Sequence, residues 1–264
     1  MMHLFTALWQ YRGFVRDTVK REFQLKYRNS MLGVVWTVLN PLAMILVYTL
    51  VFSRIMQARL PDIDGTFAYS IYLCAGLLTW GLFAEITTRC QNIFLENANL
   101  LKKVAFPRMT LPVIVVVSAL LNFSIIFSIF LVFLLVVGTF PGIMILALLP
   151  LLLVQILFSA GLGILLGVLN VFFRDVGQFF AVVLQFWFWF TPIVYPAGIL
   201  PEHLQQLLVF NPMATLIAAY QQILVYGRMP DWYSLAPVLV TALGICLLAL
   251  LTFRKRVGDI VDEI

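Results

Sequence analysis

Two oppositely charged side chains inside an apolar run are the first candidates for chemistry in this sequence. Glu85 and Arg89 stand four residues apart, so on a helix they share one face and can form an ion pair. A charge at the centre of a bilayer costs about 2.5–3.5 kcal/mol, which favours a paired position near the membrane surface. The two residues are therefore predicted to form either a gate or subunit contact, or a local interfacial ion pair.

The sequence contains no pattern typical of a catalytic or nucleotide-binding site. The segment GLGILLG, residues 161–167, superficially resembles a phosphate loop, but it lies within an apolar run. Gly163 and Gly167 fit the small-xxx-small pattern of helix packing instead, and no G-x-x-x-x-G-K-[ST] motif occurs. We expect neither catalysis nor a bound cofactor or metal in this chain. Reduced, structural thiols are expected at the three cysteines, which lack metal-ligand spacing: Cys74, Cys90 and Cys246.

The composition is that of a membrane protein. The chain has 264 residues, of which 62% are hydrophobic and 11% charged, and its mean hydropathy is +1.01. Soluble domains are about half apolar and about a quarter charged. The pI of about 9.2 reflects basic residues that follow membrane topology, so no nucleic-acid partner is expected. Because Glu85 is the one acidic residue well inside a predicted span, a proton-coupled carrier is disfavoured.

An all-α protein with six membrane spans is predicted, since a spanning helix needs about 20 apolar residues. The basic residues at Arg54, Arg59 and Arg228 fall on one side, and all the others fall on the opposite side. The positive-inside rule makes the richer side cytoplasmic, with both termini there. The expected domains are a cytoplasmic N-terminal segment (1–33), a membrane domain (34–253) and a cytoplasmic tail (254–264). The predicted spans are residues 34–52, 68–94, 109–137, 143–172, 178–194 and 232–253.

A basic amphipathic stretch precedes the first span. On a helix, Arg16, Lys20 and Arg21 lie on one arc, whereas an apolar row at i+4 spacing follows the opposite side and is interrupted by Glu22. Such a helix lies in the membrane interface. It is either the positive flank of a spanning helix or a docking helix that transmits force from a cytoplasmic partner.

Aromatic residues are concentrated in the first, second and fifth predicted spans. They form either an interfacial belt with lipid-facing rings or the lining of a channel for a sugar polymer, because C–H faces of sugars pack on aromatic rings. The candidate channel residues are Trp36, Tyr48, Tyr72, Trp80, Phe83, Trp187 and Trp189.

The segment between the fifth and sixth predicted spans is semi-polar and rich in proline. Residues 200–210 and 213–226 read as two short helices separated by Asn211-Pro212, and neither is long enough to cross a bilayer. They are predicted to re-enter the outer leaflet and return, buried against protein. The alternative is a loop on the membrane surface.

Four motifs occur in a defined order along the chain. They are YRNSMLGVVWTVLNP (27–41), NANLLKKVAFPR (97–108), FFRDV (172–176) and FTPIVYP (190–196). Together with the six predicted spans, this set resembles the permease subunit of type-2 ABC exporters. The branch it resembles most exports O-antigen, teichoic acid and capsular polysaccharide.

The resemblance implies a homodimer of permeases that forms the channel, powered by two copies of a separate ATPase subunit that binds ATP and Mg²⁺. It also implies an interface helix at 14–28, a coupling helix at 97–108 and re-entrant helices within 200–226. The expected substrate is an undecaprenyl-diphosphate-linked polysaccharide in a Gram-negative inner membrane. The alternatives are a related permease for teichoic acid, capsule, a drug or another lipid, and a non-transporting scaffold. The candidate ATPase contacts are Arg16, Lys20, Arg21, Asn97, Leu101, Lys102, Lys103, Phe106, Arg108, Arg174 and Asp175.

Overall fold

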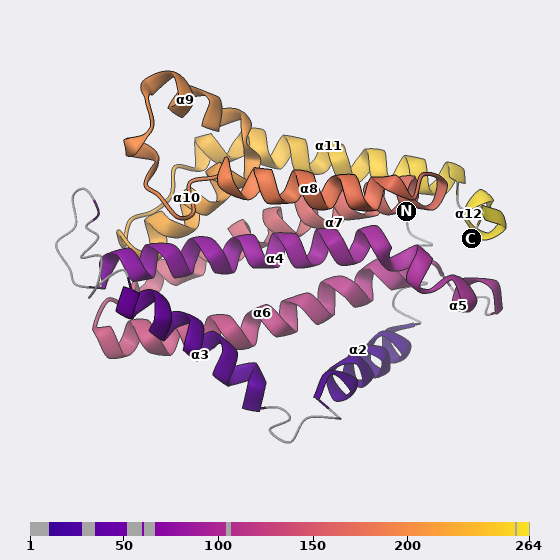
Figure 1. The fold of residues 1–264 in the computed structure, drawn as a ribbon, viewed down its shortest axis with the longest axis horizontal. Helices are drawn as coiled ribbons and strands as arrows, with labels where there is room; N and C mark the ends of the chain where they lie inside the picture. The colour runs from indigo at the N-terminus through magenta and orange to yellow at the C-terminus, as the bar shows by residue number, and fades with distance from the viewer. Residues whose placement is uncertain are drawn as a thin grey trace.

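The computed structural model describes residues 11–27, 35–51, 60, 67–103, 107–256 and 258–263, and this part of the chain is built from helices. The longer helices lie side by side along the long axis of the molecule (Figure 1). The helices in chain order are α2 (Arg12–Tyr27), α3 (Trp36–Tyr48), α4 (Ala68–Glu96), α5 (Ala98–Lys103), α6 (Thr110–Val137), η3 (Gly142–Ala147), α7 (Leu148–Phe172), α8 (Asp175–Trp189), η4 (Ala197–Ile199), α9 (Glu202–Leu207), η5 (Leu208–Phe210), α10 (Pro212–Leu224), α11 (Trp232–Arg256) and α12 (Asp259–Glu263).

Four helical segments are long and apolar enough to cross a membrane. They are α4, α6, η3 with α7, and α11, and they reproduce four of the predicted spans with almost the same ends. The end of α6 shows how a local residue type sets a helix end. Gly138 adopts a left-handed φ of 79°, and its N–H donates to the carbonyl oxygens of Leu134 and Leu135. Glycine takes this conformation without the steric penalty that a Cβ would bring. The prediction of an all-α, multi-pass membrane protein is confirmed.

The helices described at the first and fifth predicted spans are short. α3 has 13 residues and α8 has 15, so α8 is about 22 Å long, against a hydrocarbon core of about 30 Å. The prediction that the fifth helix continues to residue 194 is wrong, because the helix ends at Trp189 just before the Thr191-Pro192 step. Proline disfavours the α conformation at the preceding residue. The described residues thus contain four candidate spans, or five if one bent pair is counted, and the count of six stays a prediction.

α7 is the central helix, and a row of glycines brings its neighbours close. A Cβ on Gly161 would lie 2.8 Å from Cys246 Sγ in α11, and a Cβ on Gly163 would lie 2.6 Å from Cys90 Cβ in α4. One on Gly167 would lie 2.6 Å from the carbonyl oxygen of Cys90. These contacts confirm that the glycines serve helix packing. All three cysteines are described, and all are free.

The bent pair lies at the end of the molecule opposite α5 and α12 (Figure 1). Residues 202–210 and α10 meet at 100°. Asn211 caps α10, since its Oδ1 accepts hydrogen bonds from the N–H groups of Met213 (3.1 Å) and Ala214 (3.3 Å). α10 is largely buried, whereas no residue of α9 is buried. The prediction of two short helices is confirmed, although burial against protein holds for the second one alone.

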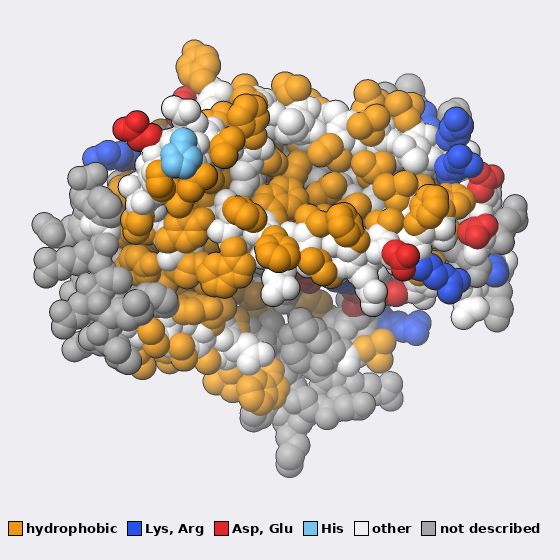
Figure 2. Space-filling view, turned by 45° about the horizontal axis from the view of Figure 1, so that its top comes forward, with side chains coloured by type: hydrophobic (Ala, Val, Ile, Leu, Met, Phe, Trp, Pro, Cys, Tyr) orange, Lys and Arg blue, Asp and Glu red, His pale blue; other side chains and the backbone are white. Residues whose placement is uncertain are grey.

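Basic side chains gather at the end of the molecule that carries α5 and α12 (Figures 1 and 2). This end includes Lys102 on α5, Arg174 between α7 and α8, and the three basic residues that close α11, Arg254, Lys255 and Arg256. A mainly apolar surface follows towards the other end (Figure 2). The fold therefore brings the separate basic segments of the sequence together on one side.

Candidate functional site

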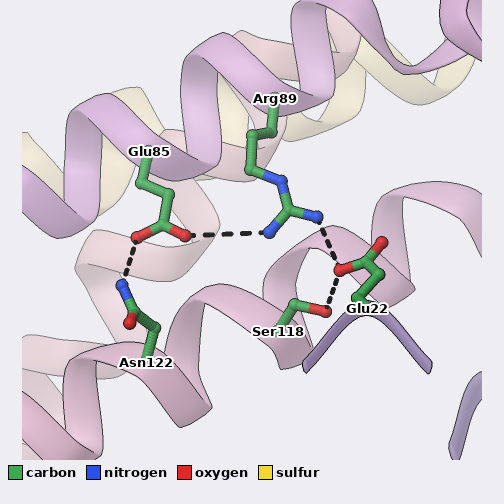
Figure 3. Close-up of polar contacts among 5 residues, drawn as sticks. All are labelled: Glu22, Glu85, Arg89, Ser118 and Asn122. Atoms are coloured by element: carbon green, nitrogen blue, oxygen red, sulfur yellow. Dashed lines mark hydrogen bonds and ion pairs between the residues drawn. The ribbon is translucent and has the colours of Figure 1, made fainter. Parts of the chain in front are cut away.

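A network of charged and polar side chains joins α2, α4 and α6 (Figure 3). Arg89 on α4 donates to Glu22 Oε2 on α2 at 2.8 Å, and its second terminal nitrogen lies 3.7 Å from Glu85 Oε1. Ser118 Oγ on α6 donates to Glu22 at 2.7 Å, and Asn122 Nδ2 donates to Glu85 at 3.1 Å. One guanidinium therefore connects two carboxylates, and each carboxylate also accepts a hydrogen bond from α6.

The predicted Glu85–Arg89 ion pair is present, and it is the longer of the two contacts of Arg89. The sequence analysis missed Glu22, which it treated as an interruption of the apolar face of α2. Its residue type could have indicated the contact. Glu22 is acidic and lies on the apolar face of an amphipathic helix, and a charge on a face that packs against the spans requires a partner there. This network connects α2 to α4 and to the first half of α6.

The described part of the predicted coupling helix is short. α5 spans Ala98–Lys103, and Asn97 precedes it, donating from Nδ2 to the carbonyl of Ile93 at 2.9 Å. Leu101 is 6% exposed, so in this chain it packs in the core, and its contact with an ATPase stays a prediction. Lys102 is exposed and Arg108 is half-buried, whereas Phe106 and the side chain of Lys103 lie outside the described residues.

A second exposed segment is the turn between α7 and α8. Phe173, Arg174 and Asp175 are all exposed, and Phe173 is 65% exposed. Asn170 fixes this turn: its Oδ1 accepts from the N–H of Gly177 at 2.9 Å, and its Nδ2 donates to the carbonyl of Gln91 on α4 at 3.3 Å. Asn170 was also missed, although an amide inside an apolar run is itself a sign of a specific bond. The turn is thus a surface feature on a fixed base.

Three of the seven predicted channel aromatics, Trp80, Phe83 and Trp187, form a cluster inside the chain. Trp80 and Phe83 are 8% and 0% exposed, and the Phe83 ring centroid lies 5.3 Å from that of half-buried Trp187 and 5.7 Å from that of Phe158. Trp187 Nε1 donates to Asn211 Oδ1 at 2.8 Å, which ties the cluster to the cap of α10. The Phe83–Trp187 contact is edge-to-face and the Phe83–Phe158 contact is stacked, and contacts of both kinds stabilise a core.

The remaining channel candidates separate into buried and exposed side chains. Tyr72 is buried and its hydroxyl lies 3.1 Å from the carbonyl oxygens of both Pro192 and Tyr195. Trp36 and Trp189 are 42% and 58% exposed, and Tyr48 is half-buried. The structure therefore does not place the seven predicted rings along one surface.

The described residues contain no group of three His, Cys, Asp or Glu side chains that could hold a metal ion. The arrangement is suited to mechanical linkage between helices, because exposed charges lie at one end and a polar network connects α2 to two long candidate spans. The family model for ABC-2 type transporters matches residues 16–225. The chain belongs to the ABC-2 type transporter family. Membership identifies it as the membrane permease component of such a transporter and not as an enzyme.

Curated relatives agree with this family and cover nearly all of the chain. The O-antigen export system permease protein RfbA of Myxococcus xanthus is 31% identical over 266 residues, covering 100% of both chains. A protein of the same name from Klebsiella pneumoniae is 29% identical over 89% of this chain and 90% of its own length. The polysialic acid transport protein KpsM of Escherichia coli is 22% identical over the same shares of the two chains.

Proposed function

We propose that this chain is the permease subunit of an ATP-driven exporter that moves an O-antigen polysaccharide, linked to undecaprenyl diphosphate, across the bacterial inner membrane to the periplasm. One observation carries the proposal: the likeness to the O-antigen export permease of Myxococcus xanthus runs the whole length of both chains. The weaker likeness to a polysialic acid transport protein points to the same chemical class, a sugar polymer.

The proposed assembly is a homodimer of this chain with two copies of an ATPase subunit that supplies the ATP and Mg²⁺ sites. A P-loop motif is absent from the sequence, so the hydrolysis of ATP is assigned to that partner. The proposed topology has six spans, with α3 and α8 completing the count, and has both termini in the cytoplasm. In this assignment residues 1–33 and 254–264 flank a membrane domain of residues 34–253, and membrane lipid surrounds the dimer.

The ATPase contacts are proposed at the basic end of the molecule. The exposed turn around Arg174 and Asp175 and exposed Lys102 on α5 are the best placed, since they lie at one end together (Figure 1). Arg16, Lys20 and Arg21 on α2 are exposed as well, and their proposed contribution passes through the Glu22–Arg89 network to α4. Buried Leu101 supports α5 from inside.

The channel is proposed to run at the homodimer interface. Exposed Trp36 and Trp189, with half-buried Tyr48, are the remaining candidates to contact a polymer. Tyr72 and the Trp80 cluster are assigned to packing, because buried rings cannot touch a passing sugar.

The function is tested by removing the chain from the bacterium that makes it. We expect lipid-linked polymer to accumulate on the cytoplasmic side while its synthesis continues, measured by labelling the polymer before and after cell permeabilisation. A change in drug tolerance without polymer accumulation would assign the chain to a drug permease. Unchanged polymer distribution would identify a scaffold and contradict the proposal.

The coupling surface is tested with Phe173→Ala/Arg174→Ala/Asp175→Ala. These side chains are exposed, so the variant should fold and insert normally but lose transport-coupled ATP hydrolysis in the purified complex. The matched control is Arg228→Ala/Met229→Ala, an exposed segment after α10 at the opposite end, which should keep it. Equal hydrolysis rates in both variants would remove the turn from the ATPase contact.

A further inference from the structure

A groove runs between α2 and the first half of α6, with a volume of about 490 Å³. Its floor is apolar: Val19 and Phe23 contribute from α2 and Val117 contributes from α6. Val19 is 5% exposed, so it lies at the bottom of the groove. Small-molecule sites typically have volumes of about 300–1,000 Å³. The groove is therefore large enough for part of a lipid chain.

Three basic residues line the same groove along α2. Arg12, Arg16 and Lys20 recur at intervals of four residues, so they form one row along the helix. Among the described residues, none that lines the groove is acidic. The groove thus combines an apolar floor with a positive edge.

The contacts of Glu22 hold the groove in this shape. Glu22 bonds to Arg89 and Ser118 on its own side of α2, so its charge is neutralised by Arg89 and does not face the groove. These bonds anchor one edge of α2 to the spans and leave the row from Arg12 to Lys20 along the other edge. The network therefore connects α2 to the spans on the side away from the basic row.

We propose that this groove binds one membrane phospholipid with an anionic headgroup. The acyl chain lies on the apolar floor and the phosphate lies beside the basic row. The location supports a lipid, because part of the apolar floor lies on α6, which is a candidate membrane span. Charge supports an anionic lipid over a neutral one, since basic residues at a membrane surface attract anionic headgroups. The proposal requires only that the chain lies in a membrane, and it is independent of what the transporter exports.

The test uses the purified full-length chain in detergent, titrated separately with phosphatidylglycerol and phosphatidylcholine of identical acyl chains. Native mass spectrometry counts the bound lipids. We expect one tightly bound phosphatidylglycerol, and a preference over phosphatidylcholine that falls at least about tenfold in Arg12→Gln/Arg16→Gln/Lys20→Gln. Val117→Trp fills the floor and leaves the charges in place, so it should weaken the binding of both lipids at that site.

The matched control removes three positive charges elsewhere. Arg228→Gln/Arg254→Gln/Lys255→Gln changes exposed residues that do not line the groove, and it should keep the full preference. An equal loss in both triple variants would show that net charge alone attracts the lipid and would overturn the proposal, as would an unchanged preference in the α2 variant. Undecaprenyl diphosphate is added as a competitor: if it displaces phosphatidylglycerol and binds more tightly, the groove belongs to a diphosphate lipid, and the phospholipid assignment is wrong.

Discussion

A double-mutant cycle on Glu22 and Arg89 tests whether the polar network holds α2 against the spans. The two side chains are 37% and 33% exposed and their atoms are 2.8 Å apart. Exposed pairs contribute about 0.2–1 kcal/mol, and breaking a buried pair costs about 3–5 kcal/mol. A site that is two-thirds buried lies between these limits. We expect Arg89→Gln to lower the free energy of unfolding by about 2 kcal/mol, because two carboxylates lose their cation.

The cycle separates the pair from the rest of each side chain. With Glu22→Gln, Arg89→Gln and the double variant, we expect a coupling energy of about 1 kcal/mol. The measurement is unfolding in mixed micelles as the fraction of sodium dodecyl sulfate rises, followed by tryptophan fluorescence. The comparison pair is Arg256 and Asp259, whose atoms are 3.0 Å apart but whose side chains are 52% and 53% exposed. A coupling energy for Glu22 and Arg89 no larger than that of the exposed pair would refute the anchoring role.

Two further predictions concern packing and capping, and the same unfolding measurement checks both. Gly163→Ala should lower the free energy of unfolding by about 1–3 kcal/mol, because its Cβ would lie 2.6 Å from Cys90 Cβ. The control, Gly244→Ala, has open space around it and should be neutral or stabilising. Similar losses of stability in the two variants would contradict the close-packing argument. Asn211→Ala removes the cap of α10 and the acceptor of Trp187 Nε1, so it should lower the free energy of unfolding by about 2 kcal/mol. Asn211→Asp should retain most of the stability, because it keeps the acceptor oxygen. A loss below about 0.5 kcal/mol for Asn211→Ala would contradict this role.

The long spans could be predicted from the sequence because one property, an apolar run of sufficient length, determines them. α4, α6 and α11 have ends that the hydropathy pattern already gives, and Asn211-Pro212 marks the bend before α10. The glycine row was equally predictable, since close helix contact is what small residues at this spacing allow. These features are local in sequence.

The site residues required information that is distant in sequence. Glu22 and Arg89 are separated by 67 positions, and no helical periodicity relates them. Aromatic side chains such as Trp80 and Phe83 occur in channel linings and in protein cores alike, so only their burial distinguishes the two roles. α8 is shorter than its apolar run because its end is set by the turn before Pro192. A pattern in a single sequence does not show which distant side chains pair or which residues are buried. It also does not show where tertiary hydrogen bonds end a helix.

The glycine contacts of α7 also determine which parts of the permease can move. The neighbours of α7 come so close at its glycines that even a Cβ would not fit. A helix packed in this way cannot slide or rotate without a steric clash, so we expect α4, α7 and α11 to move as one rigid unit. α8 has one buried residue, Phe180, and the described side chains of α3 include two, Pro41 and Ile45. Apart from the end of α8, which Trp187 ties to the cap of α10, we expect these two helices to be displaced more easily than the trio. If the channel opens by moving helices, we expect α3 and α8 to move and α4, α7 and α11 to stay in place.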